Sequence, residues 1–109
     1  MYTPPAPYVV ISTDQFDSWL TSIRSTQYVG FLKAATRKLM RGNFGNAKSL
    51  KNGLFEYKAE FGPGYRIYYC LQGIDHIILL YGGDKSFQSK DIRTALEIKK
   101  FLEGDTDGS

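Results

Sequence analysis

Hydrophobic residues recur at helical spacing in two consecutive segments near the start of the chain. In the first segment Thr13 or Asp14 can cap the opening turn, and the apolar positions are Phe16, Trp19, Leu20 and Ile23. The second begins near Thr26 and ends at Gly42, which tolerates a left-handed helix end, with apolar positions Tyr28, Leu32, Ala35 and Leu39. Each helix must bury its apolar stripe, so the pattern predicts a helical hairpin packed on a sheet.

Alternation of apolar and polar residues predicts strands on either side of this hairpin. A short strand over residues 8–11 precedes the helices. Residues 54–61 alternate strictly, Gly62-Pro63-Gly64 reverses the chain, and residues 65–71 return. We therefore expect an antiparallel hairpin with one buried face and one solvent-exposed face.

The last third of the chain predicts one more strand and a helix. Residues 76–81 are apolar on both sides, as expected for a central strand that is covered on both faces. Gly82-Gly83 is expected to end that strand. Ser86 or Ser89 can then cap a final helix, whose apolar positions are Ile92, Ala95, Ile98 and Leu102.

This order of elements predicts an α+β fold. An N-terminal strand and a helical hairpin pack on a small, mainly antiparallel four-stranded sheet, and a C-terminal helix follows. We expect an extended lead-in over residues 1–7, a single domain over residues 8–103 and a flexible acidic tail over residues 104–109.

Composition narrows the classes of function. The N-terminus lacks a secretory signal pattern, and the sequence has no apolar run of membrane-spanning length, so we expect a soluble cytoplasmic protein with no membrane partner. The single cysteine, Cys70, has no second cysteine with which to form a disulfide or a redox pair. The single histidine, His76, has no neighbour at ligand spacing, which argues against a metal site or a serine–histidine pair.

Positive charge is concentrated in the middle of the chain. Residues 33–66 contain eight basic and two acidic side chains, whereas Glu103, Asp105 and Asp107 in the tail have no basic neighbour. This polarity suits a polyanionic partner such as nucleic acid. The alternative is a solvated helix face, which explains Lys33, Arg37 and Lys38 but not Lys58 and Arg66.

Three separated motifs carry a resemblance to a known family. They are Gly42-Asn43-Phe44-Gly45-Asn46, Gly62-Pro63-Gly64-Tyr65-Arg66-Ile67-Tyr68-Tyr69 and Gly82-Gly83-Asp84-Lys85-Ser86-Phe87-Gln88. In this order they resemble the RelE/ParE toxins of type II toxin–antitoxin systems, in the addiction-module killer or HigB-like branch. The chain departs from the family pattern at Lys58, where an arginine is usual, and at Asn46, where an aspartate is usual.

The resemblance implies a ribosome-dependent messenger RNA endoribonuclease that inhibits translation. Such toxins cleave without a metal or other cofactor, because the ribose 2′-hydroxyl attacks the adjacent phosphate. By resemblance Arg66 is the phosphate-binding arginine. Lys58 is a second functional cation that is placed to act as base, and Lys85 completes the catalytic candidates. The implied partners are the ribosome, messenger RNA and a small helix-turn-helix antitoxin encoded by the neighbouring gene.

Four more residues are candidates for contacts with RNA or the ribosome. Lys48 and Lys51 would contact a phosphate backbone, although both are equally explained as solvated lysines. Tyr68 would stack on a base or instead pack under a helix. Gln88, like Lys85, would face the substrate or brace the last helix. Cys70 lacks an activating partner and is treated as a bystander.

Two other functions remain open from the sequence. ParE-like relatives share the fold but inhibit DNA gyrase without a nuclease site, so fold alone does not separate them. A catalytically weakened toxin that acts mainly as an antitoxin-bound co-repressor is the second alternative, to which the exchange at Lys58 gives some support.

Overall fold

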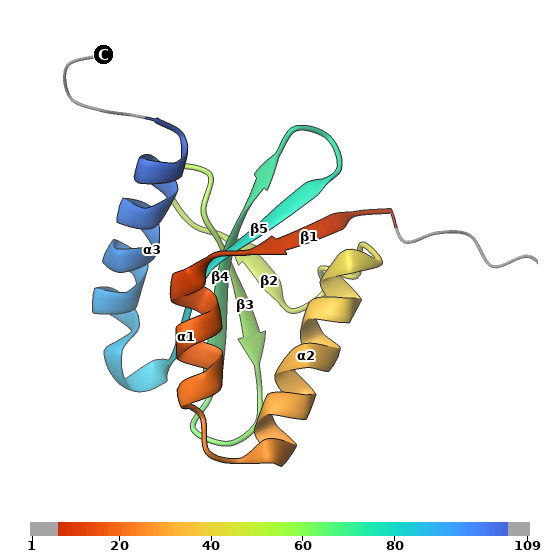
Figure 1. Ribbon diagram of the computed structural model, residues 1–109, viewed down its shortest axis with the longest axis vertical. Helices are drawn as coiled ribbons and strands as arrows, with labels where there is room; N and C mark the ends of the chain where they lie inside the picture. The colour runs from red at the N-terminus through yellow and green to blue at the C-terminus, as the bar shows by residue number, and fades with distance from the viewer. Residues whose placement is uncertain (1–6, 105–109) are drawn as a thin grey trace, which may run out of the picture.

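The computed structural model describes residues 7–104, so residues 1–6 of the expected lead-in (1–7) and residues 105–109 of the expected tail (104–109) lie outside the described residues. The elements follow in the order β1 (Val9–Ser12), α1 (Asp14–Ser22), α2 (Thr26–Met40), β2 (Ala47–Ser49), β3 (Phe55–Ala59), β4 (Tyr65–Gln72), β5 (His76–Asp84), the 3-10 turn η1 (Lys85–Phe87) and α3 (Gln88–Leu102) (Figure 1). The predicted α+β class is confirmed. Within residues 7–104 we find no helix with the length and apolar character needed to cross a membrane.

The strands form one mixed sheet in the order β1-β5-β4-β3-β2. Strand β1 runs parallel to β5, and the other neighbouring strands are antiparallel. The sequence predicted four strands and missed β2. That strand has only three residues, of which Lys48 and Ser49 are exposed, so it shows no apolar alternation.

Both N-terminal helices begin as their sequences predict, and α2 ends as predicted, whereas α1 ends at Ser22, one residue before the predicted apolar position Ile23. The Thr13 hydroxyl accepts a hydrogen bond of 3.0 Å from the backbone N–H of Phe16 at the start of α1. Ser25 accepts one of 3.1 Å from the N–H of Tyr28 at the start of α2. Gly42 has a φ of 82° just beyond α2, which is the left-handed conformation expected of a helix-terminating glycine.

Helices cover both faces of the sheet, so the molecule has two hydrophobic cores. Helices α1 and α2 pack on one face, in a core that includes Phe16, Leu32, Leu39, Tyr57, Ile67, Tyr69, Ile77 and Leu79. Helix α3 packs on the other, in a core of Leu54, Tyr68, Cys70, Ile78, Leu80, Ala95 and Ile98 (Figure 1). The prediction that the hairpin keeps one face in solvent is therefore wrong over most of its length. The physical reason is the apolar stripe of α3, which requires an apolar sheet face for its burial.

Gly82 and Gly83 continue β5 and do not end it, contrary to the prediction. A Cβ atom at Gly82 would collide with the ring of Trp19 from α1, and one at Gly83 would collide with the carboxylate of Asp91 from α3. Glycine is therefore required at both positions, because the side chains of Trp19 and Asp91 lie directly on the strand backbone, one on each face of the sheet.

We predict that Gly82→Ala lowers the free energy of unfolding by about 1–3 kcal/mol, because the new methyl group displaces the Trp19 ring from the sheet. The control is Gly30→Ala in α2, where a Cβ atom would meet nothing within 4 Å. That change should raise the free energy of unfolding by roughly 0.5–1 kcal/mol through helix propensity. Urea denaturation measures both, and equal stability of the two variants would contradict this packing.

Candidate functional site

Three cationic residues lie at the end of the sheet near the β3–β4 turn. Lys58 on β3 is the direct cross-strand partner of Arg66 on β4. A Cβ atom placed on Gly64 would lie 3.3 Å from Lys85 Cδ and 3.4 Å from Arg66 Nη1, so these two side chains flank the same glycine. The structure therefore brings the three catalytic candidates, Lys58, Arg66 and Lys85, to one place.

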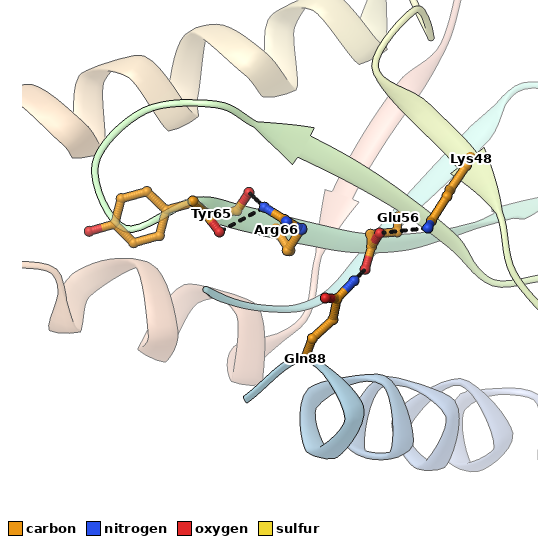
Figure 2. A network of polar contacts seen from close by, with 6 residues as sticks. Lys48, Glu56, Tyr65, Arg66 and Gln88 are labelled. Atoms are coloured by element: carbon orange, nitrogen blue, oxygen red, sulfur yellow. Dashed lines mark hydrogen bonds and ion pairs between the residues drawn. The ribbon is translucent and has the colours of Figure 1, made fainter. Parts of the chain in front are cut away.

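The Arg66 guanidinium is partly engaged with the turn itself. Its Nη1 donates hydrogen bonds to the carbonyl oxygens of Gly64 at 2.8 Å and Tyr65 at 3.3 Å (Figure 2). Its Nε is buried without a hydrogen-bond partner among the described residues. Within the described part of the chain, Arg66 also makes no ion pair with Glu56 or Glu60. The side chain is thus half-buried and pre-oriented, and its charge is not neutralised by a carboxylate.

A buried carboxylate lies next to this cluster. Glu56 is 0% exposed, and its Oε2 accepts a hydrogen bond of 2.7 Å from Gln88 Nε2 at the start of α3. Its Oε1 lies 3.8 Å from the ammonium of Lys48 on β2. Figure 2 shows the carboxylate between these two side chains. Gln88 and Lys48, both candidates for RNA contacts, are therefore held by Glu56, which links β2, β3 and α3.

Sequence analysis missed Glu56 because strict alternation placed it on a solvent-exposed face. A signal was available in the same strands. Tyr68 and Cys70 share that face of β4, and the final helix has its own apolar stripe. Together they indicate that a helix covers this face, so a carboxylate among them has to find polar partners.

Tyr68 does not present a stacking surface. It is 0% exposed and packs in the core beneath α3, which is the second of its two interpretations. Burial, followed by the nearby charge of Glu56, raises the pKa of its hydroxyl far above the ordinary value. The hydroxyl has no hydrogen-bond partner among the described residues. The apolar neighbours supplied by α3 explain why a ring predicted to face the substrate lies in the interior.

Lys51 and Cys70 lie apart from the cationic cluster. Lys51 is in the exposed turn before β3, and a Cβ atom on Gly53 in that turn would lie 3.4 Å from Lys99 Cε near the end of α3. This is the opposite end of β3 from Lys58. Cys70 is buried, and burial raises the pKa of its thiol, which agrees with an unreactive side chain.

Two aspartates surround the start of the last helix. The Asp84 carboxylate accepts a hydrogen bond of 2.7 Å from the N–H of Ser86, so Asp84 caps η1. Neither Ser86 nor Ser89 caps α3, contrary to the prediction, because η1 intervenes and no side chain caps α3. Asp91 is nearly buried over Gly83, the cross-strand partner of Arg66. Burial, reinforced by the charge of Asp84, raises the pKa of Asp91.

The cluster has the properties of an anion-binding site. One arginine and two lysines from three different elements can surround a phosphodiester, with the guanidinium already fixed on the turn. Residues 7–104 contain no group of three or more His, Cys, Asp or Glu side chains that could hold a metal ion.

Comparison with known proteins gives one sequence relative. No protein-family model matches the chain. An uncharacterized protein of Haemophilus influenzae is 43% identical over 84 residues, which cover 77% of this chain and 85% of the relative.

Two solved structures share the fold at low sequence identity. A mutant of the Escherichia coli toxin RelE in the free state has a TM-score of 0.68 and 13% identity, covering 84% of this chain and 96% of the toxin. The RelBE2 toxin–antitoxin complex of Mycobacterium tuberculosis has a TM-score of 0.58 and 20% identity, covering 72% and 99%. The expected RelE-like fold is thus confirmed.

We predict that Asp91→Asn changes the pH dependence of stability. Because the pKa of Asp91 is raised above 3.8 in the folded protein, ionisation of Asp91 costs stability as pH rises through the folded pKa. Asn removes that cost, so the variant should gain stability relative to wild type between pH 3 and pH 7. Thermal unfolding across this range measures the gain. Glu97→Gln, an exposed change on the same helix, is the control, and an equal gain there would contradict the prediction.

Proposed function

The chain belongs to one family with the Haemophilus influenzae protein and has the fold of the RelE/ParE superfamily, and we propose that it is a type II toxin that cleaves messenger RNA on the ribosome. The observation that carries the proposal is the convergence of Lys58, Arg66 and Lys85 at one end of the sheet. A protein that acts only by binding DNA gyrase does not need two lysines beside one fixed guanidinium.

The cleavage step follows from these groups. The 2′-oxygen bonds to phosphorus, the bond from phosphorus to the 5′-oxygen breaks, and the 5′-oxygen takes up a proton. Arg66 would bind the phosphate oxygens as their negative charge grows, with little reorganisation because its Nη1 is already held by two carbonyl groups. Lys58 would accept the proton of the 2′-hydroxyl, and Lys85 would stabilise or protonate the leaving oxygen. No cofactor takes part in this scheme.

Lys48, Gln88 and Glu56 have supporting roles in this proposal. Glu56 holds Gln88 and thereby fixes the start of α3 beside the cations. The Lys48 side chain is 56% exposed, so it can contact a phosphate while its ammonium remains near Glu56. Lys51 would serve only as a distant contact to ribosomal RNA.

The proposed partner in the cell is an antitoxin. The solved complex of a protein with this fold contains one, and the cationic face suits an acidic, initially flexible segment. We propose a small helix-turn-helix protein encoded by the neighbouring gene.

We predict that Arg66→Ala reduces ribosome-dependent messenger cleavage on the order of a hundredfold or more, because a transition-state donor is lost. Arg66→Lys should restore only part of the rate, since an ammonium lacks the planar guanidinium that the Gly64 and Tyr65 carbonyl groups hold in place. The hydrogen bonds to Gly64 and Tyr65 are lost too, so the free energy of unfolding should fall by about 1 kcal/mol. Cleavage on programmed ribosomes and urea denaturation measure the two effects.

Arg24→Ala, an exposed arginine between α1 and α2, controls for loss of positive charge and should cleave at the wild-type rate. Full activity of Arg66→Ala would remove Arg66 from the site. If induced wild-type protein stopped DNA synthesis while translation continued, gyrase inhibition would replace the proposed activity.

We predict that the product of the neighbouring gene co-purifies with this chain and suppresses its toxicity in two-gene expression. Burial of carboxylates against Arg66 and the lysines adds charge-assisted hydrogen bonds, so the complex should persist at moderate salt. Absence of any complex under these conditions would contradict the toxin–antitoxin assignment.

A further inference from the structure

A hollow of about 230 Å³ lies between α2 and β3, and Lys58 of the cationic cluster is among its lining residues. Its lining includes Phe31, Lys38, Asn46 and Phe61. Phe31 is 43% exposed although it is a large apolar side chain, and its ring meets that of Phe61 edge-on at a centroid distance of 5.1 Å. A partly exposed aromatic ring next to a lysine is the arrangement by which proteins stack unpaired bases.

A second hollow, of about 240 Å³, adjoins the first. The two share Asn46, Lys58 and Glu60 as lining residues, and Lys48 lines only the second. The two hollows meet because the pairing between β2 and β3 ends at Ala47 and Tyr57. The following residues of β3, Lys58 and Ala59, have no strand neighbour on that side. A single backbone hydrogen bond, from Lys58 N–H to the Asn46 carbonyl oxygen at 3.0 Å, spans this edge.

The charge around the joined hollows is strongly positive. Lysines 38, 48 and 58 line them, and Glu60 is the one acidic side chain among the described lining residues. Helix α2, which borders the first hollow, contains no acidic residue over Thr26–Met40. Such a surface attracts a phosphate backbone.

We propose that the joined hollows are a groove for single-stranded RNA, in which one base stacks on Phe31 and the flanking phosphates lie against Lys38 and Lys58. An unpaired strand is required, because the bases of a duplex already stack on each other. Glu60 repels phosphates and accepts hydrogen bonds from base amino groups, so it favours a base on its side. Lys58 lines the groove and also pairs with Arg66 across the strands, so the groove leads to the proposed cleavage site.

This inference deepens the proposed function, but RNA binding in the groove does not require cleavage. An acidic protein segment is the competing occupant. An acidic segment would pair with the lysines but would not need a flat aromatic ring. Substitution of Phe31 therefore distinguishes RNA from an acidic protein segment as the occupant.

The test measures binding of a short, labelled, single-stranded oligoribonucleotide to the full chain by fluorescence anisotropy, without ribosomes. Phe31→Ala should weaken binding about tenfold through loss of one base stack. Phe31→Leu keeps an apolar contact with Phe61 but lacks the ring face, so it should weaken binding similarly, whereas Phe31→Tyr should not. Lys38→Ala should weaken binding and flatten its salt dependence by roughly 0.7 in the logarithmic slope.

Phe101→Ala and Lys100→Ala on α3 are the matched controls, since Phe101 is 80% exposed and both lie far from the groove in sequence. Circular dichroism and thermal unfolding establish that each variant is folded. The proposal is overturned if wild type fails to bind the oligonucleotide at low salt, or if Phe31→Leu binds as tightly as Phe101→Ala. It is also overturned if polyglutamate binds as tightly as RNA and loses affinity equally with Phe31→Leu.

Cleavage on programmed ribosomes separates this inference from the proposed function. Binding that depends on Phe31 without any cleavage would retain the groove and remove the nuclease assignment. If Arg66→Ala abolished cleavage while the Phe31 variants bound RNA as tightly as wild type, the nuclease assignment would stand and the proposed RNA groove would be wrong.

Discussion

The close approach of Trp19 and Asp91 to Gly82 and Gly83 is the constraint on which the rest of this structure depends. Two consecutive residues of β5 have no side chain, and each accepts a group from a different face of the sheet. The contact at Gly82 fixes α1, and the contact at Gly83 fixes α3. Gly83 is the cross-strand partner of Arg66, so the contact between Asp91 and Gly83 also fixes the distance of α3 from the cationic cluster. Helix packing and site geometry are therefore coupled through two glycines.

The buried carboxylates of Glu56 and Asp91 hold neighbouring elements in place and do not neutralise Arg66. Glu56 is buried between Gln88 and Lys48, and Asp91 is buried above Gly83. Neither forms an ion pair with Arg66 in the described residues, so the guanidinium keeps its charge for an anion. Burial of a carboxylate that has no ion-pair partner among the described residues lowers stability, as the raised pKa of Asp91 indicates. Proteins commonly tolerate such a loss where the groups organise a functional surface.

Local sequence patterns predicted the local structure well. The capped helical stripes, the Gly-Pro-Gly turn and the alternation on either side of it correctly placed Lys58 beside Arg66. The errors in burial concern tertiary contacts. Burial of Glu56 and Tyr68 depends on where α3 packs, and the true role of Gly82-Gly83 depends on Trp19 and Asp91, which are 63 and 8 residues away in sequence. A three-residue strand such as β2 has too few positions to show a period. Family resemblance singled out Lys58, Arg66 and Lys85 as candidates but could not show which neighbours hold them.

The turn that carries Arg66 is held rigid by aromatic rings. Tyr65 and Phe61 flank the turn and pack against each other, and the Tyr28 ring of α2 lies against both. Trp19 meets Tyr65 from α1, so the cluster joins both helices to the hairpin. A Cβ atom on Gly62 would already lie 3.0 Å from the Tyr28 ring, which leaves the turn little room to shift. Since α2 carries Phe31 and Lys38 and the turn positions Arg66, the groove and the cationic cluster belong to one packed unit. A nucleic acid that bound both would therefore meet prearranged charges, and little of its binding free energy would be lost in ordering the protein.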